Sequence, residues 1–178
     1  MDDQQITQML LNPETQRQGF EAAVRQYGEQ LYWQVRKIVL THDDADDVVQ
    51  NTFLKAWSSL DTFRGESKLS TWLFRIAVNE SLNHLEKQKK SVRFDVDEDG
   101  AANLLQSDPY FDGDETQLQL QEAIGTLPEK QRIVFNLKYF QEMKYEDMSQ
   151  VLGTSVSALK ASYHHAVQKI TSFFEKLD

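Results

Sequence analysis

The sequence contains no cysteine among its 178 residues. A disulfide framework and a thiolate metal site are therefore both excluded. Apolar runs long enough to cross a membrane are also missing. The first ten residues, MDDQQITQML, lack the basic start and the apolar stretch of a secretory signal peptide. These absences predict a soluble protein of the cytoplasm that does not insert into a membrane.

Basic residues are too few for the chain to bind nucleic acid by charge alone. There are 19 lysines and arginines against 28 aspartates and glutamates, a formal net charge of -9. Non-specific affinity for a polyanion comes mostly from basic side chains that displace counterions. The acidic excess is concentrated, however, because residues 92–117 hold eight acidic residues against the single Arg93. After residue 117 the chain has seven acidic and seven basic residues, so that part is neutral.

The acidic stretch 92–117 is predicted to be an interdomain linker. It contains Gly100, Pro109 and Gly113 and shows no sustained apolar period. Such a composition favours extended or disordered chain, with a short helix around residues 101–105 as the alternative. We therefore expect one domain over residues 1–91 and a second over residues 118–178.

Apolar residues recur at helical spacing in both parts, and strand-like alternation of useful length is absent. In the N-terminal part we expect a helix that starts near residues 13–14, a second after the acidic cluster at 43–47, and a third over about 69–90. An acidic cluster suits a helix N-terminus. The candidate core residues of these helices are Phe20, Val24, Tyr27, Leu31, Val35, Ile38, Ala45, Val48, Val49, Phe53, Ala56, Leu60, Leu69, Leu73, Ile76, Leu82 and Leu85.

The C-terminal part carries a helix-turn-helix pattern. A short helix, YEDMSQVLG at 145–153, ends at Gly153, a residue that permits a turn conformation which a side chain opposes. Ser155 can cap a longer helix from 156 to about 174. Met148, Leu152, Val156, Leu159, Tyr163 and Ile170 would pack inward. The second helix of such a unit enters the major groove of DNA, whereas the plainer alternative is an ordinary helical hairpin.

Aromatic and basic residues are interleaved around a glycine in FRGESKLSTWLFRIAVNESLN at 63–83. Aromatic rings can stack on unpaired bases while cations follow the backbone of a single strand. Asparagine offers a donor and an acceptor together, which suits the edge of a base. Asn79 and Asn83 share one helix face with Trp72 and Arg75 nearby, and Lys87, Lys89, Lys90 and Arg93 follow. Taken singly, these residues could equally be core, solvated face or helix end.

Three segments in this order resemble bacterial sigma factors of the extracytoplasmic-function (ECF) class. DDADDVVQNTFLKAW at 43–57 resembles their polymerase-binding helix, and 63–83 resembles their segment that melts and reads the −10 element. LPEKQRIVF at 127–135, with the helix-turn-helix, resembles their −35-binding domain. The resemblance covers nearly all of the chain from residue 20 to 174 except the linker. It implies an all-α protein of two small helical domains joined by an acidic linker, the C-terminal one with the helix-turn-helix.

The resemblance also implies roles for individual residues. Core RNA polymerase would be bound by Asp47, Gln50, Asn51 and Leu54. The −10 element of promoter DNA would be bound by Phe63, Arg64, Ser67, Trp72, Arg75, Asn79, Asn83, Lys87 and Lys90. The loop at 63–67 would hold a flipped-out base, and the linker would thread through the polymerase cleft. The −35 element would be bound by Ser157, Lys160, Ala161, His164 and His165. An anti-sigma factor is a further partner that the resemblance allows.

The recognition helix departs from the family pattern. Where relatives tend to carry an arginine-rich run, this chain has SYHHAV at 162–167, and the usual Thr-Val before the lysine is replaced by Ala158 and Leu159. Fewer permanent charges would then face the DNA phosphates. Protonation of His164 and His165 at lower pH would restore part of the missing charge.

Two other classes of protein fit parts of the pattern. A repressor or activator could carry the same helix-turn-helix and bind DNA alone as a dimer, but the segment 63–83 has no place in it. A metal-dependent hydrolase is suggested by His42 beside Asp43, Asp44, Asp46 and Asp47. Catalytic metals need several ligands that converge, while the other histidines lie on unrelated helices, and no phosphate loop or nucleophile motif is present. We therefore expect no metal, no cofactor and no catalysis by the chain itself.

Overall fold

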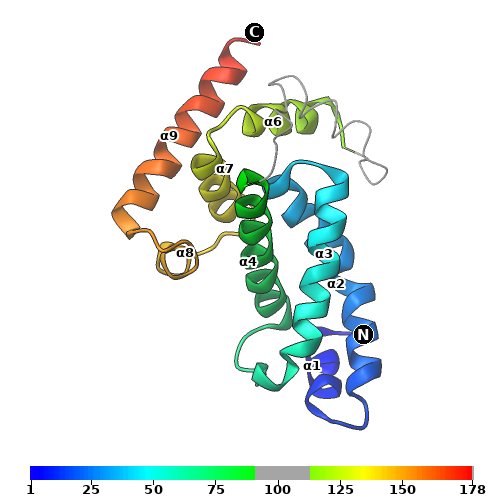
Figure 1. The fold of residues 1–178 in the computed structure, drawn as a ribbon. Helices are drawn as coiled ribbons and strands as arrows, with labels where there is room; N and C mark the ends of the chain where they lie inside the picture. Colours follow the sequence, from blue (N-terminus) through cyan, green and yellow to red (C-terminus); the bar gives the residue numbers. More distant parts are fainter. Residues whose placement is uncertain (91–112, 178) are drawn as a thin grey trace. The chain divides into compact units, whose positions relative to one another are not determined.

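The computed structural model describes residues 1–90 and 113–177, and its regular structure is helical (Figure 1). No strand occurs in these two ranges, which confirms the predicted all-α class. The described chain divides into two compact units, one of helices α1 to α4 and one of helices α6 to α9. The alternative helix at 101–105 lies outside the described residues. None of the described helices combines the length and the apolar character that a membrane span requires.

The first unit contains α1 (Asp3–Leu11), α2 (Gln16–Val39), α3 (His42–Ser58), the short 3-10 helix η1 (Leu60–Thr62) and α4 (Leu69–Lys90). The three helices expected in this part correspond to α2, α3 and α4, and α4 has the predicted bounds. Helix α1 was not predicted.

The core of the first unit lies where α2 packs against α1 and α4. Tyr27, Leu31, Val35 and Ile38 of the predicted α2 stripe are buried. Val24 is exposed instead, so its prediction as core is wrong: in this turn of α2 the buried positions are Ala22 and Ala23. The α4 side of this core consists of Leu69, Leu73, Phe74, Ala77, Val78, Ser81 and Leu85, all buried.

Helices α3 and α4 are tied together near Asp44 in the first turns of α3. Nε2 of His84 lies 3.0 Å from Oδ1 of Asp44. The side-chain amide of Gln88 donates to the other carboxylate oxygen at 2.9 Å. Asp44 therefore serves to join two helices.

The second unit contains α6 (Glu115–Gly125), α7 (Glu129–Phe135), the π-helical turn η2 (Asn136–Phe140), α8 (Tyr145–Leu152) and α9 (Val156–Glu175). Helix α6 begins within the stretch predicted as linker, because Asp114 caps it by accepting from the backbone N–H of Gln117 at 2.9 Å. One apolar cluster joins α6, α7 and α9 through Ala123, Ile124, Leu127, Phe135, Ala166 and Ile170.

Helices α8 and α9 form the predicted helix-turn-helix with the predicted start and cap. Gly153 ends α8 in the left-handed region at φ 64, where glycine carries no steric cost. The Ser155 hydroxyl then accepts from the backbone N–H of Ala158 at 3.2 Å and caps α9. Met148 of α8 and Leu159 of α9 are fully buried, and the two helices pack against each other. This packing fixes which face of α9 is left open.

Candidate nucleic-acid and polymerase interfaces

One face of α4 presents polar side chains in a row. Arg75, Asn79, Asn83 and Lys87 follow one another at steps of four residues, and all four are exposed. Residues four apart on a helix lie on the same face. The face is fixed in direction because the opposite side of α4 is the buried core of the unit. Lys90 ends this helix, and its side chain lies outside the described residues.

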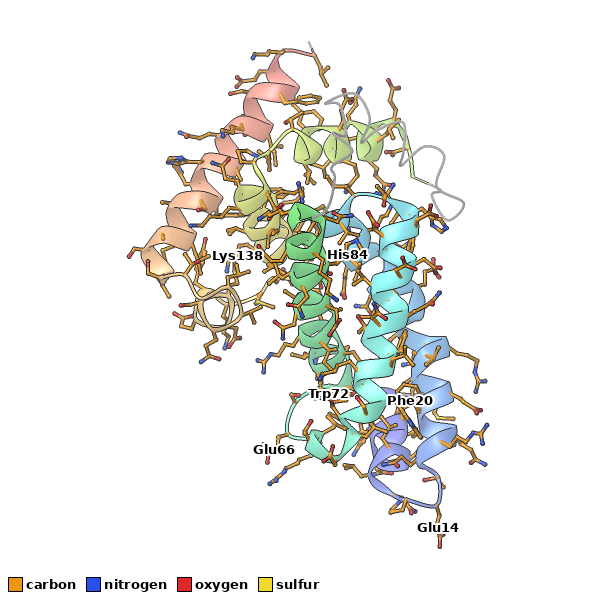
Figure 2. The ribbon with its side chains drawn as sticks, viewed as in Figure 1. Glu14, Phe20, Glu66, Trp72, His84 and Lys138 are labelled. Atoms are coloured by element: carbon orange, nitrogen blue, oxygen red, sulfur yellow. The ribbon has the colours of Figure 1, made fainter. Side chains whose placement is uncertain are left out.

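The loop at 63–67 lies before the first turn of α4. Arg64 and Ser67 are exposed. Phe63 is only 4% exposed, and its ring centre lies 4.9 Å from that of the half-buried Trp72. The Phe63 ring therefore packs on Trp72 and does not stand at the surface, and its predicted contact with DNA stays a prediction. Figure 2 shows Glu66 of the loop and Trp72 at the start of α4.

The face of α3 predicted to bind polymerase is open. Asp47, Gln50, Asn51 and Leu54 are all exposed, and Leu54 is 68% exposed although it is apolar. Trp57, one turn further along, is 45% exposed and its ring lies 5.0 Å from that of Phe20 on α2. Trp57 ends the segment 43–57 that resembles the polymerase-binding helix, but it is not among the four residues predicted to bind polymerase. An exposed apolar surface of this kind is a feature of protein–protein contact sites.

The face of α9 predicted to enter the major groove is also open. Ser157, Lys160, Ala161, His164 and His165 are all exposed. The two imidazole rings lie 6.1 Å apart. Lys160 is the one permanently charged side chain among these five, so this face carries little positive charge of its own.

A second lysine reaches the helix-turn-helix from outside it. Nζ of Lys138, on the π-helical turn, lies 4.5 Å from the ring centre of Tyr145 at the start of α8. Nζ of Lys160 lies 5.7 Å from the same ring centre. Cations within about 6 Å of an aromatic ring centre are attracted to its face. The ammonium groups of Lys138 and Lys160 thus both lie near the Tyr145 ring. Neither Tyr145 nor Lys138 was predicted from the sequence as part of this surface.

The metal-hydrolase alternative finds no support in the part of the chain that the structure describes. No group of three histidine, cysteine, aspartate or glutamate side chains that could hold a metal ion occurs there. Asp44, a member of the suggested cluster, is engaged by His84.

Comparison with known families accounts for both units. Residues 23–91 match the model of sigma-70 region 2, and residues 117–170 match that of sigma-70 region 4. An all-helical protein with these two regions in this order is a transcription initiation factor. The chain belongs to the sigma-70 family, and within it to the ECF class, whose members bind core RNA polymerase and promoter DNA.

Sigma factors from other bacteria match this chain over nearly its whole length. The chain is 27% identical to the RNA polymerase sigma-H factor of Pseudomonas aeruginosa over 98% of this chain and 95% of that one. It is 29% identical to the ECF RNA polymerase sigma-E factor of Escherichia coli over 98% and 97% of the two chains. Among solved structures it resembles CnrH in complex with the cytosolic domain of CnrY, with a TM-score of 0.63, 26% identity and coverage of 98% and 97%. The fold also resembles RpoE of Bartonella quintana in complex with the anti-sigma factor NepR, with a TM-score of 0.67, 23% identity and coverage of 88% and 96%.

Proposed function

We propose that this chain directs core RNA polymerase to promoters through three exposed surfaces, one each on α3, α4 and α9. The observation that carries the proposal is the exposed row of Arg75, Asn79, Asn83 and Lys87 on α4, within the region 2 match. The exposed outer face of α9 in the region 4 match supports it. The chain itself catalyses nothing and works in the cytoplasm, where RNA synthesis belongs to the polymerase.

The α3 surface docks on the polymerase. Asp47, Gln50 and Asn51 supply polar contacts around the exposed side chain of Leu54. Trp57 extends the apolar part of the surface toward Phe20. Burial of such a centre inside a polar rim is the arrangement that gives protein interfaces most of their affinity.

The α4 surface and the 63–67 loop open and read the −10 element. The loop receives a base flipped out of the non-template strand, which costs a few kcal/mol that stacking and hydrogen bonds recover. Asn79 and Asn83 read base edges with their paired donors and acceptors. Trp72 and Arg75 support the opened strands, while Lys87 and Lys90 contact phosphates.

The α9 surface binds the −35 element in the major groove. Ser157, Lys160, Ala161, His164 and His165 face the DNA. Lys138, held at the Tyr145 ring beside Lys160, adds a phosphate contact. We take residues 1–91 and 118–178 as the two functional domains and the acidic stretch 92–117 as the segment that passes through the polymerase cleft.

An anti-sigma factor is a further proposed partner. Two of the solved structures that resemble this chain are complexes, one with an anti-sigma factor and one with the cytosolic domain of CnrY. A chain of the same class with open α3 and α9 surfaces offers such a partner the same faces that polymerase and DNA use.

Reconstitution with core RNA polymerase tests the proposal. Transcripts made from fragmented genomic DNA are sequenced from their 5′ ends, and we expect a shared pair of upstream elements at −10 and −35. The Leu54→Asp variant should lose these transcripts because a charge is placed in the docking centre. Leu177→Asp is the matched control, since Leu177 is also an exposed leucine, at 51%, but lies beyond α9. Transcripts without shared upstream elements would refute the proposal.

A further inference from the structure

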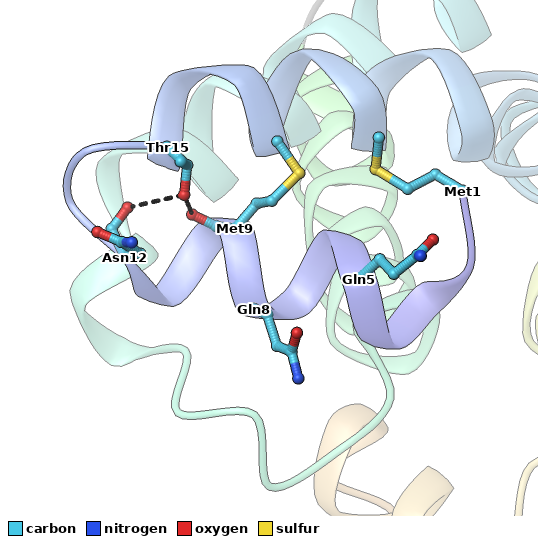
Figure 3. Close-up of a pocket in the computed structure, with 6 residues that line it drawn as sticks. All are labelled: Met1, Gln5, Gln8, Met9, Asn12 and Thr15. Carbon is cyan, nitrogen blue, oxygen red and sulfur yellow. Dashed lines mark hydrogen bonds between the residues drawn. The ribbon is translucent and has the colours of Figure 1, made fainter.

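The N-terminal helix α1 lies against the loop at 63–67. Leu11, the last residue of α1, is 49% exposed. A Cβ atom added to Gly65 would lie 3.3 Å from Cδ1 of Leu11 and 3.5 Å from Cγ2 of Thr7. The methyl groups of these two residues therefore bound the space into which a side chain at position 65 would extend. Figure 3 shows α1 with the loop running alongside it.

The loop has few other restraints over the same residues. At one end the buried Phe63 packs on Trp72, and at the other end Leu69 is fully buried. All five residues between these anchors are exposed. Gly65 stands near the middle of that stretch in the left-handed region, at φ 73. The approach of α1 therefore falls within the exposed stretch between the two anchors.

Helix α1 can restrain the loop because α1 is itself packed into the core of the first unit. Ile6 is fully buried and Leu10 is 2% exposed, so one side of the helix belongs to the core. Asp2 and Gln5 form a reciprocal capping box. The backbone N–H of Gln5 donates to the Asp2 carboxylate at 2.8 Å, and the backbone N–H of Asp2 donates to the side-chain oxygen of Gln5 at 3.0 Å.

Hydrogen bonds also join α1 to α2 at both ends. The Tyr27 hydroxyl of α2 donates to the Asp3 carboxylate, and burial together with this carboxylate raises the pKa of Tyr27 to about 12. At the other end the side-chain amide of Gln16, the first residue of α2, donates to the carbonyl of Leu10 at 3.1 Å. The hydroxyl of Thr15, just before α2, donates to the carbonyl of Met9 at 2.9 Å (Figure 3). Because α1 is held at both ends, the position of Leu11 is fixed relative to α2.

We propose that Leu11, together with Thr7, is a positioning residue for −10 recognition. On this proposal α1 holds the 63–67 loop in the conformation that receives the flipped base. The proposal rests on the function proposed above for the loop. It assigns a role to a helix that lies outside the region 2 match, which begins at residue 23. A pocket that is held in place before binding spends less free energy on ordering itself.

The test measures how strongly the holoenzyme discriminates between bases at each −10 position. Binding is compared for the best promoter and for promoters with one −10 base replaced. For Leu11→Ala we expect the discrimination to fall by about threefold to tenfold at one position, the one served by the loop, as for groups in contact. Discrimination at the other −10 positions should stay unchanged, because the α4 face is not altered.

Met9→Ala is the matched control within α1. Met9 lines a shallow hollow of about 440 Å³ together with Met1, Gln5, Gln8, Asn12 and Thr15 (Figure 3). This variant shortens a side chain of the same helix without touching the loop contact, so its discrimination should match that of the wild type. Equal losses in both variants would overturn the proposal, because they would reflect a general weakening of α1.

A double-mutant cycle adds a second readout. Alanine at Gly65 is strained at φ 73 and places its Cβ close to Leu11. Part of that crowding is relieved when Leu11 is also alanine, so Gly65→Ala should cost less discrimination in the Leu11→Ala background. Strictly additive losses would contradict the contact.

Hydrogen exchange on the free chain separates this proposal from the function on which it rests. Amides of the loop should exchange several times faster in Leu11→Ala than in the wild type or in Met9→Ala, since the restraint on the loop is lost. If the wild-type holoenzyme prefers no base at any −10 position, the proposed function fails and the positioning role falls with it. If the wild type discriminates and Leu11→Ala does so equally well, only the positioning role is refuted.

Discussion

The exposed faces of α4 and α9 differ in the chemistry that they offer to DNA. The α4 face combines two amides, Asn79 and Asn83, with the cations Arg75 and Lys87. The α9 face has two small residues, two histidines and Lys160 as its one permanent charge. The α4 face thus carries both base-reading groups and phosphate-binding groups on one helix, while the α9 face is short of the second kind.

In the second unit, folding therefore brings a positive charge from outside α9 close to Lys160. Lys138 comes from the π-helical turn and meets Lys160 at the Tyr145 ring. Its ammonium group also donates to the carbonyl of Met143 at 3.3 Å, which fixes its place. We therefore expect substitutions on α4 to have larger effects than substitutions on or near α9.

The largest effect should come from the two asparagines. Asn79→Ala or Asn83→Ala should weaken discrimination at particular −10 bases by about 1–3 kcal/mol, the value of a good bidentate contact. The measurement is holoenzyme binding to a panel of promoters that differ at single −10 positions.

Lys87→Ala is the matched control on the same face. A phosphate contact carries no sequence information, so its loss should weaken binding to every promoter about equally and reduce the salt dependence. If the lysine and asparagine variants gave the same pattern across the panel, the separate roles assigned to them would be wrong.

A smaller effect is expected at Tyr145. Tyr145→Leu removes the ring that attracts Lys138 and Lys160, each contact being worth about 0.5–1 kcal/mol at an exposed site. Binding that depends on the −35 element should fall several-fold. Tyr145→Phe keeps the ring and should bind nearly as well as the wild type. A Phe variant as weak as the Leu variant would show that the hydroxyl, and not the ring, matters.

How far these surfaces could be predicted from the sequence depends on the range of the contacts involved. Helix α4 was predicted with its bounds because its apolar residues repeat at helical spacing over many turns. Helix α1 was missed because it has only Ile6 and Leu10 as core residues, although its capping box, Asp2 with Gln5, was readable. Helix α6 was missed because its N-terminal cap, Asp114, lies within the acidic stretch that was predicted to be a linker.

The exposed residues of the candidate site were predicted from the sequence, but the packing contacts that hold them in place were not. Asn79 and Asn83 share a face by helical geometry alone, so sequence spacing was sufficient. The burial of Phe63, the approach of Lys138 to Tyr145 and the approach of Leu11 to Gly65 all depend on packing between separate elements. Periodicity within one helix carries no information about such contacts.

The smallest effect is expected from the histidine pair. Histidine changes charge between about pH 5 and 8, and Lys160 and Lys169 stand one turn away from His164 and His165 along α9. Nearby DNA phosphates favour the charged imidazole, so −35-dependent binding should strengthen as the pH falls from about 8 to about 6. The measurement compares promoters with and without the −35 element, in the wild type and in the double variant His164→Gln, His165→Gln. An identical pH dependence of the two proteins would exclude the histidines as its source.

The dependence of promoter binding on polymerase tests the central claim most directly. The region after residue 117 is electrically neutral and the whole chain carries a net charge of -9, so little counterion release is available to the free chain. In a gel-shift titration at physiological salt, the free chain should bind promoter DNA poorly, whereas the chain with core polymerase should bind it tightly and open it. Tight, sequence-specific binding by the free chain would contradict the account and favour a regulator that binds DNA alone.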